Sequence, residues 1–161
     1  MKKISTIIFA LFISALIIAC AATSPYPLNT PAPFTKFKTG EDSYVLLDSL
    51  KGKTVVVFFW ASWCSFSRGE IERLNQIALK YKDDPTYYFV AVSLDTKRED
   101  FEAFLTAHNL SGFHHAFSGN SGDDEAAIYF KVSALPQTFV IDPNGIVIGK
   151  GSGVDLSKFG M

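Results

Sequence analysis

The chain has few cysteines, no excess of charge of either sign and no long apolar run. Only two of its 161 residues are cysteines, Cys20 and Cys64, which excludes a scaffold stapled by several disulfides. Its 15 basic and 16 acidic residues nearly cancel, so the basic excess of a nucleic-acid-binding protein is missing and we expect no nucleic-acid partner. The apolar run over residues 4–19 is shorter than the roughly 20 residues that a membrane-spanning helix needs. The hydrophobic content of 48% is nevertheless enough for one packed domain.

The N-terminus has the pattern of an exported, lipid-modified protein. Lys2 and Lys3 precede the apolar run, which ends in Ile-Ala directly before Cys20. This ending resembles the lipobox of bacterial lipoprotein signal peptides. The resemblance implies that residues 1–19 are a signal peptide cleaved before Cys20, and that the Cys20 sulfur carries a diacylglycerol thioether. An uncleaved apolar anchor, or an ordinary secretory signal with a chance cysteine, is the alternative interpretation.

The lipoprotein interpretation determines the expected location and the redox chemistry. Several buried acyl chains would hold the protein durably to a membrane of the bacterial cell envelope, on its extracytoplasmic side. Ala21 rather than Asp follows the cysteine, which favours the outer membrane, facing the periplasm, in a Gram-negative cell. With Cys20 acylated, Cys64 is the only free thiol, and an internal disulfide is excluded.

Residues 20–43 are predicted to form a lipid-anchored, proline-rich tether. Prolines at alternating positions favour extended backbone and block helix formation. The prolines concerned are Pro25, Pro27, Pro31 and Pro33. We therefore place the start of the folded domain at residue 44.

Residues 44–161 predict one α/β domain with a mixed sheet. The β-branched and aromatic run over residues 54–60 is apolar on both faces, as a central strand covered by helices on each side should be. Alternating strands and helices come first and a hairpin comes last, which favours parallel strands joined to an antiparallel pair. The other predicted elements are a strand over 45–47, a helix over 65–81, a strand over 87–94, a helix capped by Asp95 or Thr96, a loop over 109–122, a short helix over 123–130, and hairpin strands over 137–141 and 146–150.

Two blocks of this domain, about 70 residues apart, are similar to the thioredoxin-like superfamily, specifically its TlpA-like membrane-anchored thiol-disulfide branch. Residues 50–64 read Leu-Lys-Gly-Lys-Thr-Val-Val-Val-Phe-Phe-Trp-Ala-Ser-Trp-Cys, and residues 132–142 read Val-Ser-Ala-Leu-Pro-Gln-Thr-Phe-Val-Ile-Asp. The resemblance implies a thioredoxin fold, with a central mixed sheet flanked by helices and, here, a short C-terminal end. It also implies that Pro136 is cis and packs against the active cysteine, and that the Leu135 backbone pairs with a bound partner chain.

The location of Cys64 in the sequence, apart from the family resemblance, also makes it the candidate nucleophile. It lies where a buried strand turns into a helix, so the free N–H groups of the first helical turn favour its thiolate. Trp63 and Phe66 flank it and, with Leu135, are the candidate substrate-binding residues. A buried, inert cysteine is the alternative.

The departures from the family pattern define the expected mechanism. The family's redox pair is Cys-x-x-Cys, whereas here Ser67 occupies the position of the second, resolving cysteine. Phe58 stands where thioredoxin keeps a buried acid, and Glu72 where the family usually has a helix-kinking proline. Cys64, Ser67 and Pro136 are thus the candidate catalytic residues of a monothiol exchange, of the isomerase or mixed-disulfide reductase type. The expected partners are protein thiols or disulfides and an external thiol reductant.

Other functions have weaker support. The alternative from a different class is a catalytically degenerate module that binds client or partner proteins in the groove between Cys64 and Pro136. His114 and His115 form one adjacent pair without further ligands at metal-binding spacing, and the acidic run 123–125 suits a helix N-terminus. We therefore expect no metal and no cofactor. A peroxiredoxin is disfavoured because the threonine and proline that precede its cysteine are missing.

Overall fold

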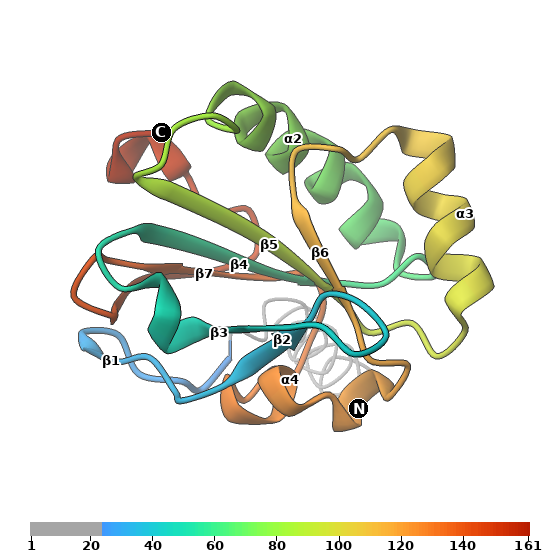
Figure 1. Ribbon diagram of the computed structural model, residues 1–161, viewed down its shortest axis with the longest axis horizontal. Coiled ribbons are helices and arrows are strands. Elements are labelled where there is room, and N and C mark those ends of the chain that lie inside the picture. The colour runs from blue at the N-terminus through green and yellow to red at the C-terminus, as the bar shows by residue number, and fades with distance from the viewer. Residues whose placement is uncertain (1–23) are drawn as a thin grey trace, which may run out of the picture.

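The computed structural model describes residues 24–161, which form a mixed sheet with helices on both faces (Figure 1). The strands are β1 (Thr30–Pro31), β2 (Lys36–Lys38), β3 (Tyr44–Leu46), β4 (Thr54–Trp60), β5 (Tyr87–Ser93), β6 (His114–Phe117), β7 (Gln137–Ile141) and β8 (Ile146–Gly151). The helices are α2 (Ser65–Lys80), α3 (Arg98–His108) and α4 (Glu125–Tyr129), with 3-10 turns η1 (Leu47–Leu50), η2 (Ser121–Asp123) and η3 (Leu156–Phe159).

Six of the strands form one sheet in the order β1-β8-β7-β4-β5-β6, and β2 pairs with β3 separately. The strands β4, β5 and β6 are parallel, whereas β7 is antiparallel to β4, β8 is antiparallel to β7, and β1 is antiparallel to β8. The parallel strands are the ones joined by helices, and the antiparallel pair β7–β8 is joined by the predicted tight turn. The mixed sheet flanked by helices confirms the predicted fold class.

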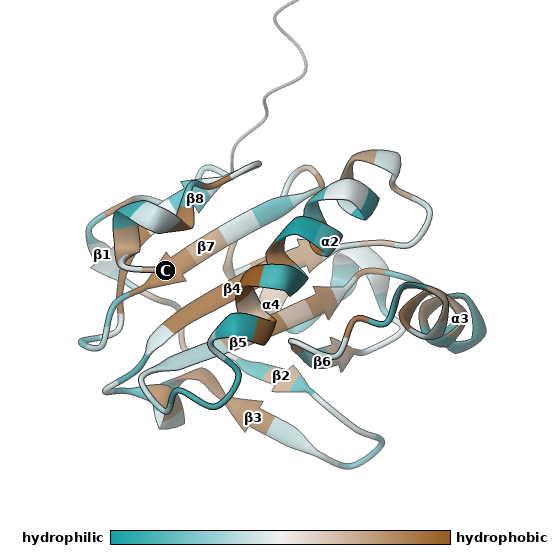
Figure 2. Cartoon of the chain, turned by 90° about the horizontal axis from the view of Figure 1, so that it is seen from above, coloured by the Kyte–Doolittle hydropathy of each residue, from teal (hydrophilic) through white to brown (hydrophobic). Residues whose placement is uncertain are grey.

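The central strand β4 supplies both halves of the core. Its side chains alternate between the two faces of the sheet, and from Val55 onward all of them are buried. Val56, Phe58 and Trp60 pack with apolar residues of α2 and α3. The opposite face holds Phe59, which packs with Phe130 and Phe139. Figure 2 shows the result, with hydrophobic colouring along β4 and β5 and hydrophilic colouring on the outward side of α2.

The N-terminal segment is part of the folded unit, which is a correction to the predicted boundary at residue 44. β1 extends the main sheet by pairing Thr30 with Val147, and β2 pairs with β3 through Phe37, which is buried. The Tyr26 ring packs against Phe130 at a centroid distance of 5.8 Å. The prolines do impose extended backbone, as predicted, but an extended segment also suits a sheet edge, where a missing N–H costs no ladder bond.

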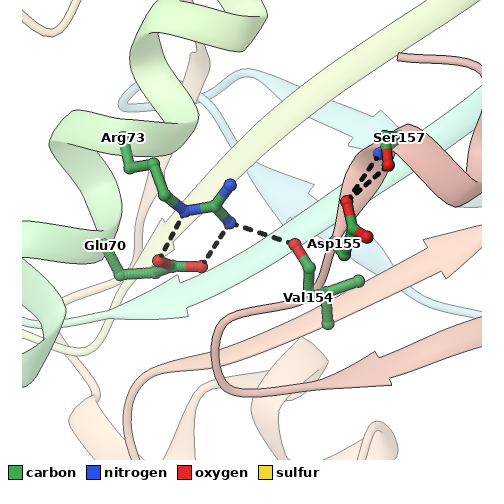
Figure 3. Close-up of polar contacts among 5 residues, drawn as sticks. All are labelled: Glu70, Arg73, Val154, Asp155 and Ser157. Atoms are coloured by element: carbon green, nitrogen blue, oxygen red, sulfur yellow. Dashed lines mark hydrogen bonds and ion pairs between the residues drawn. The ribbon is translucent and has the colours of Figure 1, made fainter.

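A hydrogen bond from Arg73 of α2 to the Val154 carbonyl connects the C-terminal segment to the helix (Figure 3). Arg73 forms two hydrogen bonds with the Glu70 carboxylate, at 2.9 and 2.8 Å, and its Nη2 also donates to the Val154 carbonyl at 3.0 Å. The Asp155 carboxylate accepts hydrogen bonds from the backbone and hydroxyl of Ser157, which lower the pKa of Asp155. These contacts place the buried Leu156 of η3 in the same apolar cluster as the α2 core residues.

The sequence patterns predicted β3 to within one residue but missed the short strands β1, β2 and β6. The stretch predicted as a loop over 109–122 contains β6, which adds a parallel edge strand beside β5. The helix α3 begins at Arg98, and its N-cap residue Lys97 provides no side-chain cap, so neither Asp95 nor Thr96 caps it. Over residues 24–161, no helix has both the length and the apolar character needed to cross a bilayer.

Candidate functional site

Cys64 lies where β4 gives way to α2. The strand ends at Trp60, a three-residue loop follows, and Cys64 is the N-cap residue of the helix with extended backbone angles. Its carbonyl oxygen accepts hydrogen bonds from the N–H groups of Ser67 and Arg68, at 3.0 and 3.3 Å. The thiol is therefore attached at the N-terminal end of a 16-residue helix, which is the positive end of the helix dipole.

The thiol faces the loop that precedes β7. Cys64 is half-buried, and its Sγ lies 3.8 Å from the Leu135 carbonyl oxygen, to which the thiol donates a hydrogen bond. The peptide bond between Leu135 and Pro136 is cis, and Pro136 is buried. Two segments that are 71 residues apart are thus in contact at one end of the sheet.

Ser67 lies one helical turn after Cys64, on the inner side of the helix. Its side chain is fully buried, and its hydroxyl has no hydrogen-bond partner among residues 24–161. A buried hydroxyl of this kind is costly when it is not satisfied. The position therefore has the spacing and the shielding of a resolving group, but it presents oxygen instead of sulfur.

Two large apolar side chains beside the thiol are exposed to solvent. Trp63 is 63% exposed and Phe66 is 71% exposed, whereas most aromatic residues of the chain are buried or half-buried. Trp63 and Phe66 flank Cys64 in the sequence and the half-buried Leu135 contacts its sulfur, and we call these three residues the apolar rim of the site. Such a rim suits contact with an apolar segment of another protein chain.

Asp95 holds the loop before Cys64, and the sequence patterns did not reveal this role. The carboxylate is 1% exposed and accepts hydrogen bonds from the Ser62 N–H at 3.1 Å, the Ser62 hydroxyl at 2.8 Å and the Ser93 hydroxyl at 2.7 Å. Arg68 Nε donates to the Ser62 carbonyl at 2.8 Å and holds the same residue from the other side. Asp95 lies two residues after Ser93, the last residue of β5, and because β4 and β5 are parallel, their carboxyl ends meet at one edge of the sheet. The position of Asp95 just after a strand that neighbours β4 could have indicated, from the sequence, that it lies near the loop before Cys64.

The other predicted features have structural partners of their own. His114 stacks on Tyr88 at a centroid distance of 4.2 Å, and His115 contacts the Leu110 carbonyl. Burial lowers the pKa of both histidines. Asp124 caps α4 by accepting from the Ala127 N–H. Within residues 24–161, no three potential metal-ligating side chains gather at one place.

Phe58 is fully buried and stacks on Phe113, so an apolar pair occupies the space beneath the site. Cys20 and the predicted signal peptide lie outside the described residues. A cavity of about 230 Å³ lies near Val55 and Ile141, at the opposite end of β4 from Cys64, and is separate from this site.

Comparison with known proteins identifies relatives of the whole domain. Residues 52–147 match the family described as thioredoxin-like. The chain is 31% identical over 106 residues to the thiol-disulfide oxidoreductase ResA of Oceanobacillus iheyensis, a match covering 65% of this chain and 52% of ResA. It thus spans about half the length of this curated relative.

Solved structures agree with the sequence matches. The crystal structure of a putative thiol:disulfide interchange protein DsbE from Chlorobium tepidum is 30% identical, with a TM-score of 0.68, and covers 82% of this chain and 89% of that one. The C-terminal domain of a putative thiol-disulfide oxidoreductase from Bacteroides thetaiotaomicron has a TM-score of 0.73 at 22% identity and covers 83% and 93%. The latter likeness supports the fold alone.

Proposed function

Because this chain belongs to the thioredoxin-like family, we propose that it is a lipid-anchored, extracytoplasmic protein that exchanges thiols and disulfides through Cys64 alone. The observation that carries the proposal is the position of Sγ, at the N-terminus of α2 and 3.8 Å from the carbonyl that precedes a cis proline. The similarity to a thiol-disulfide oxidoreductase supports the reaction class.

The proposed reaction begins with the Cys64 thiolate. It attacks one sulfur of a substrate disulfide, the substrate S–S bond breaks, and the second substrate sulfur leaves as a thiolate that takes up a proton. Cys64 and the first substrate sulfur are now joined as a mixed disulfide. An apolar substrate segment would lie on the rim of Trp63 and Phe66, beside the backbone of Leu135.

Release requires a thiol that this site does not contain. The Ser67 hydroxyl is not a nucleophile toward disulfides under mild conditions, so either a second substrate thiol or an external thiol must attack the mixed disulfide. Attack by a substrate thiol on the substrate sulfur forms a new substrate disulfide and frees Cys64, which is isomerisation. Attack by an external thiol on the Cys64 sulfur frees a reduced substrate, and a second external thiol then regenerates Cys64.

Insulin reduction with dithiothreitol as the external thiol tests this function. The native chain should accelerate precipitation of the insulin B chain slowly but measurably, and Cys64→Ala should abolish the acceleration. On a non-reducing gel the native protein should accumulate adducts that dithiothreitol removes. If native and Cys64→Ala chains behave identically, the thiol-exchange function is refuted.

Restoring the missing thiol tests the assignment of Ser67. Residues three apart on a helix share a face, so Ser67→Cys should form an internal disulfide with Cys64 under oxidant. Its reductase activity should exceed that of the native chain by about tenfold or more, because release becomes intramolecular. Ser65→Cys is the matched control, since a residue next to Cys64 in the helix points away from it. A folded Ser67→Cys chain without an internal disulfide would contradict the assignment.

A binding module remains the second candidate, and one observation favours it. The Cys64 thiol donates to the Leu135 carbonyl, an arrangement that a thiolate cannot keep because both atoms would be acceptors. A groove that holds a partner without turnover would keep this contact. The insulin assay separates the two candidates, since the binding module predicts no catalysis by the native chain.

The anchor is proposed from the lipobox that ends at Cys20. Cys20→Ser should move the protein from the detergent phase to the soluble or precursor pool, because the acyl chains can no longer be attached. A Cys20→Ser protein that stays in the detergent phase would mean that the uncleaved apolar segment is the anchor.

A further inference from the structure

The N-terminal segment 24–31 is locked onto the domain by buried polar contacts. Ser24 is fully buried, its hydroxyl donates to the Phe130 carbonyl at 2.7 Å, and its N–H donates to Gln137 Oε1 at 3.1 Å. Lys150 Nζ donates to the carbonyl oxygens of both Ser24 and Tyr26, at 2.8 and 2.6 Å. Most side chains of this segment are exposed, but its buried end at Ser24 has several partners, so the segment cannot leave the domain without leaving some of these buried groups unsatisfied.

This contact lies beside the thiol. Gln137, which receives the Ser24 N–H, directly follows the cis proline, and Leu135 on the other side of that proline contacts the Cys64 sulfur. The path from Ser24 to Cys64 Sγ therefore consists of the hydrogen bond to Gln137, two residues of backbone back to Leu135, and the contact of the Leu135 carbonyl with the sulfur. With about 3.8 Å between consecutive Cα atoms and a side chain in between, the separation is on the order of 15 Å.

The docked segment leaves a very short link to the predicted lipid. Cys20 precedes Ser24 by four residues, which span at most about 14 Å even when fully extended. A free tether over residues 21–43 in polyproline conformation would instead reach about 70 Å. Docking thus reduces the distance over which the domain can move from its anchor by roughly fivefold.

The surface next to the docking point is suited to a bilayer. Ile128 and Tyr129 of α4 are 55% and 50% exposed, and they directly precede Phe130, whose carbonyl receives the Ser24 hydroxyl. An exposed aliphatic residue beside a tyrosine, whose ring is apolar and whose hydroxyl is polar, matches the composition of membrane interfaces. The exposed Lys131 follows and is compatible with anionic headgroups.

We propose that docking of residues 24–31 confines Cys64 to a layer within on the order of 30 Å of the bilayer surface, the sum of the two reaches. Among substrates that are themselves fixed to the membrane, Cys64 therefore reaches only disulfides that lie within this layer, and disulfides held farther from the bilayer are out of reach. The inference rests on the proposed anchor at Cys20 and deepens the proposed function by naming where its substrates lie.

Energy transfer from Cys64 to the bilayer tests this proposal. The full chain is processed in a bacterial host, purified as the lipoprotein, labelled at Cys64 with a donor fluorophore and placed in phosphatidylcholine vesicles that carry an acceptor on lipid headgroups. The acceptor is chosen to give strong transfer at about 30 Å, the reach of the docked chain, and weak transfer at about 55 Å, the reach after a flexible twenty-residue spacer adds about 25 Å. The native chain should show strong transfer.

Two insertions of the same twenty-residue Gly/Ser spacer distinguish a docked segment from a free tether. Placed between Ala22 and Thr23, the spacer lengthens the link to the lipid, and transfer should fall to less than half. Placed between Glu41 and Asp42, in the exposed turn between β2 and β3, it leaves the link unchanged and transfer should stay at the native value. Equal loss with both insertions, or weak transfer in the native chain, overturns the proposal while the anchor and the thiol exchange stand.

Flotation of the protein with the same vesicles tests the proposed anchor separately. A Cys20→Ser chain should no longer float with the lipid. If it still floats, the proposed anchor fails and this inference with it, whereas insulin reduction through Cys64 continues to report on thiol exchange independently.

Discussion

Removal of the Asp95 carboxylate is expected to destabilise the fold and to release the loop before Cys64. Asp95→Ala takes a charged acceptor away from three donors, the N–H and hydroxyl of Ser62 and the hydroxyl of Ser93. Each hydrogen bond to a charged group contributes about 1.5–3 kcal/mol, but the buried carboxylate also costs desolvation energy that the substitution relieves. Ser62 is half-buried and its donors can turn to water, whereas Ser93 is fully buried and its hydroxyl cannot. The net loss in free energy of unfolding should be about 2–4 kcal/mol.

Urea unfolding of three variants measures this loss. Asp95→Asn keeps one carbonyl acceptor and should lose about half as much as Asp95→Ala. Ser62→Ala removes one hydroxyl bond and should cost about 1 kcal/mol, and combined with Asp95→Ala it should add almost nothing, because the shared bond is already gone. Asp84→Ala is the matched control: its carboxylate accepts the same kinds of bonds, from the N–H and hydroxyl of Thr86, but it lies in a surface loop where both donors can turn to water, so its cost should be clearly smaller.

Alkylation of Cys64 by iodoacetamide reports the effect on the site. In Asp95→Ala the loop that positions the thiol is released, so the alkylation rate at a fixed pH should differ from that of the native chain by severalfold, while Asp84→Ala should leave it unchanged. An Asp95→Ala chain with native stability and native alkylation kinetics would show that the carboxylate does not hold this loop.

Two further predictions concern packing and pH. Gly112→Ala should lower the free energy of unfolding in urea by about 1–3 kcal/mol, since an added Cβ would lie 2.8 Å from the Asn75 carbonyl and 2.9 Å from the Leu79 nitrogen. Gly69→Ala, where the Cβ meets open space on a helix, should instead raise it by about 0.5–1 kcal/mol. A destabilised Gly69→Ala chain would contradict the helix assignment at this position. Burial lowers the pKa of His115 below its usual 6.5, so the unfolded chain binds the proton more readily, and stability present above pH 6.5 is lost as the pH falls toward the folded-state pKa. Urea unfolding from pH 7 to 5 should show this loss, and His115→Gln should reduce it; an identical slope would refute the role of this group.

The local elements of the domain follow from sequence patterns where those patterns are long. The run over residues 54–60 is apolar at nearly every position, which leaves few structures other than a central strand, and the observed strand has these bounds. The helix after Cys64 begins at the predicted residue for a similar reason, because its apolar residues recur at helical spacing. β6 was missed because four residues carry too little periodicity, and its partner β5 is what makes it a strand.

The arrangement of the candidate site was only partly accessible. The position of Cys64 at the start of a helix and the serine one turn later follow from spacing alone. The contact between Cys64 and Leu135 was available only through a family resemblance, since nothing local relates residues 71 apart. Asp95 was read as a helix cap because Asp before a helix usually is one, whereas its actual partners lie on the neighbouring strand end and loop.

The amino-acid sequence by itself determined the chemistry that this protein can offer: one thiol at a helix start, a hydroxyl one helical turn later, and a second cysteine, four residues before Ser24, at the end of a segment that resembles a lipobox. These are properties of residue type and of spacing along the chain, which local sterics translate directly into geometry. Only the tertiary structure decided where residues 24–38 lie, because an extended proline-rich segment is equally stable in water and at a sheet edge until buried partners are present. The hydrogen bonds of Ser24 to Phe130 and Gln137, over 106 and 113 residues, are such partners, and they hold Ser24 at the end of the sheet where Cys64 lies.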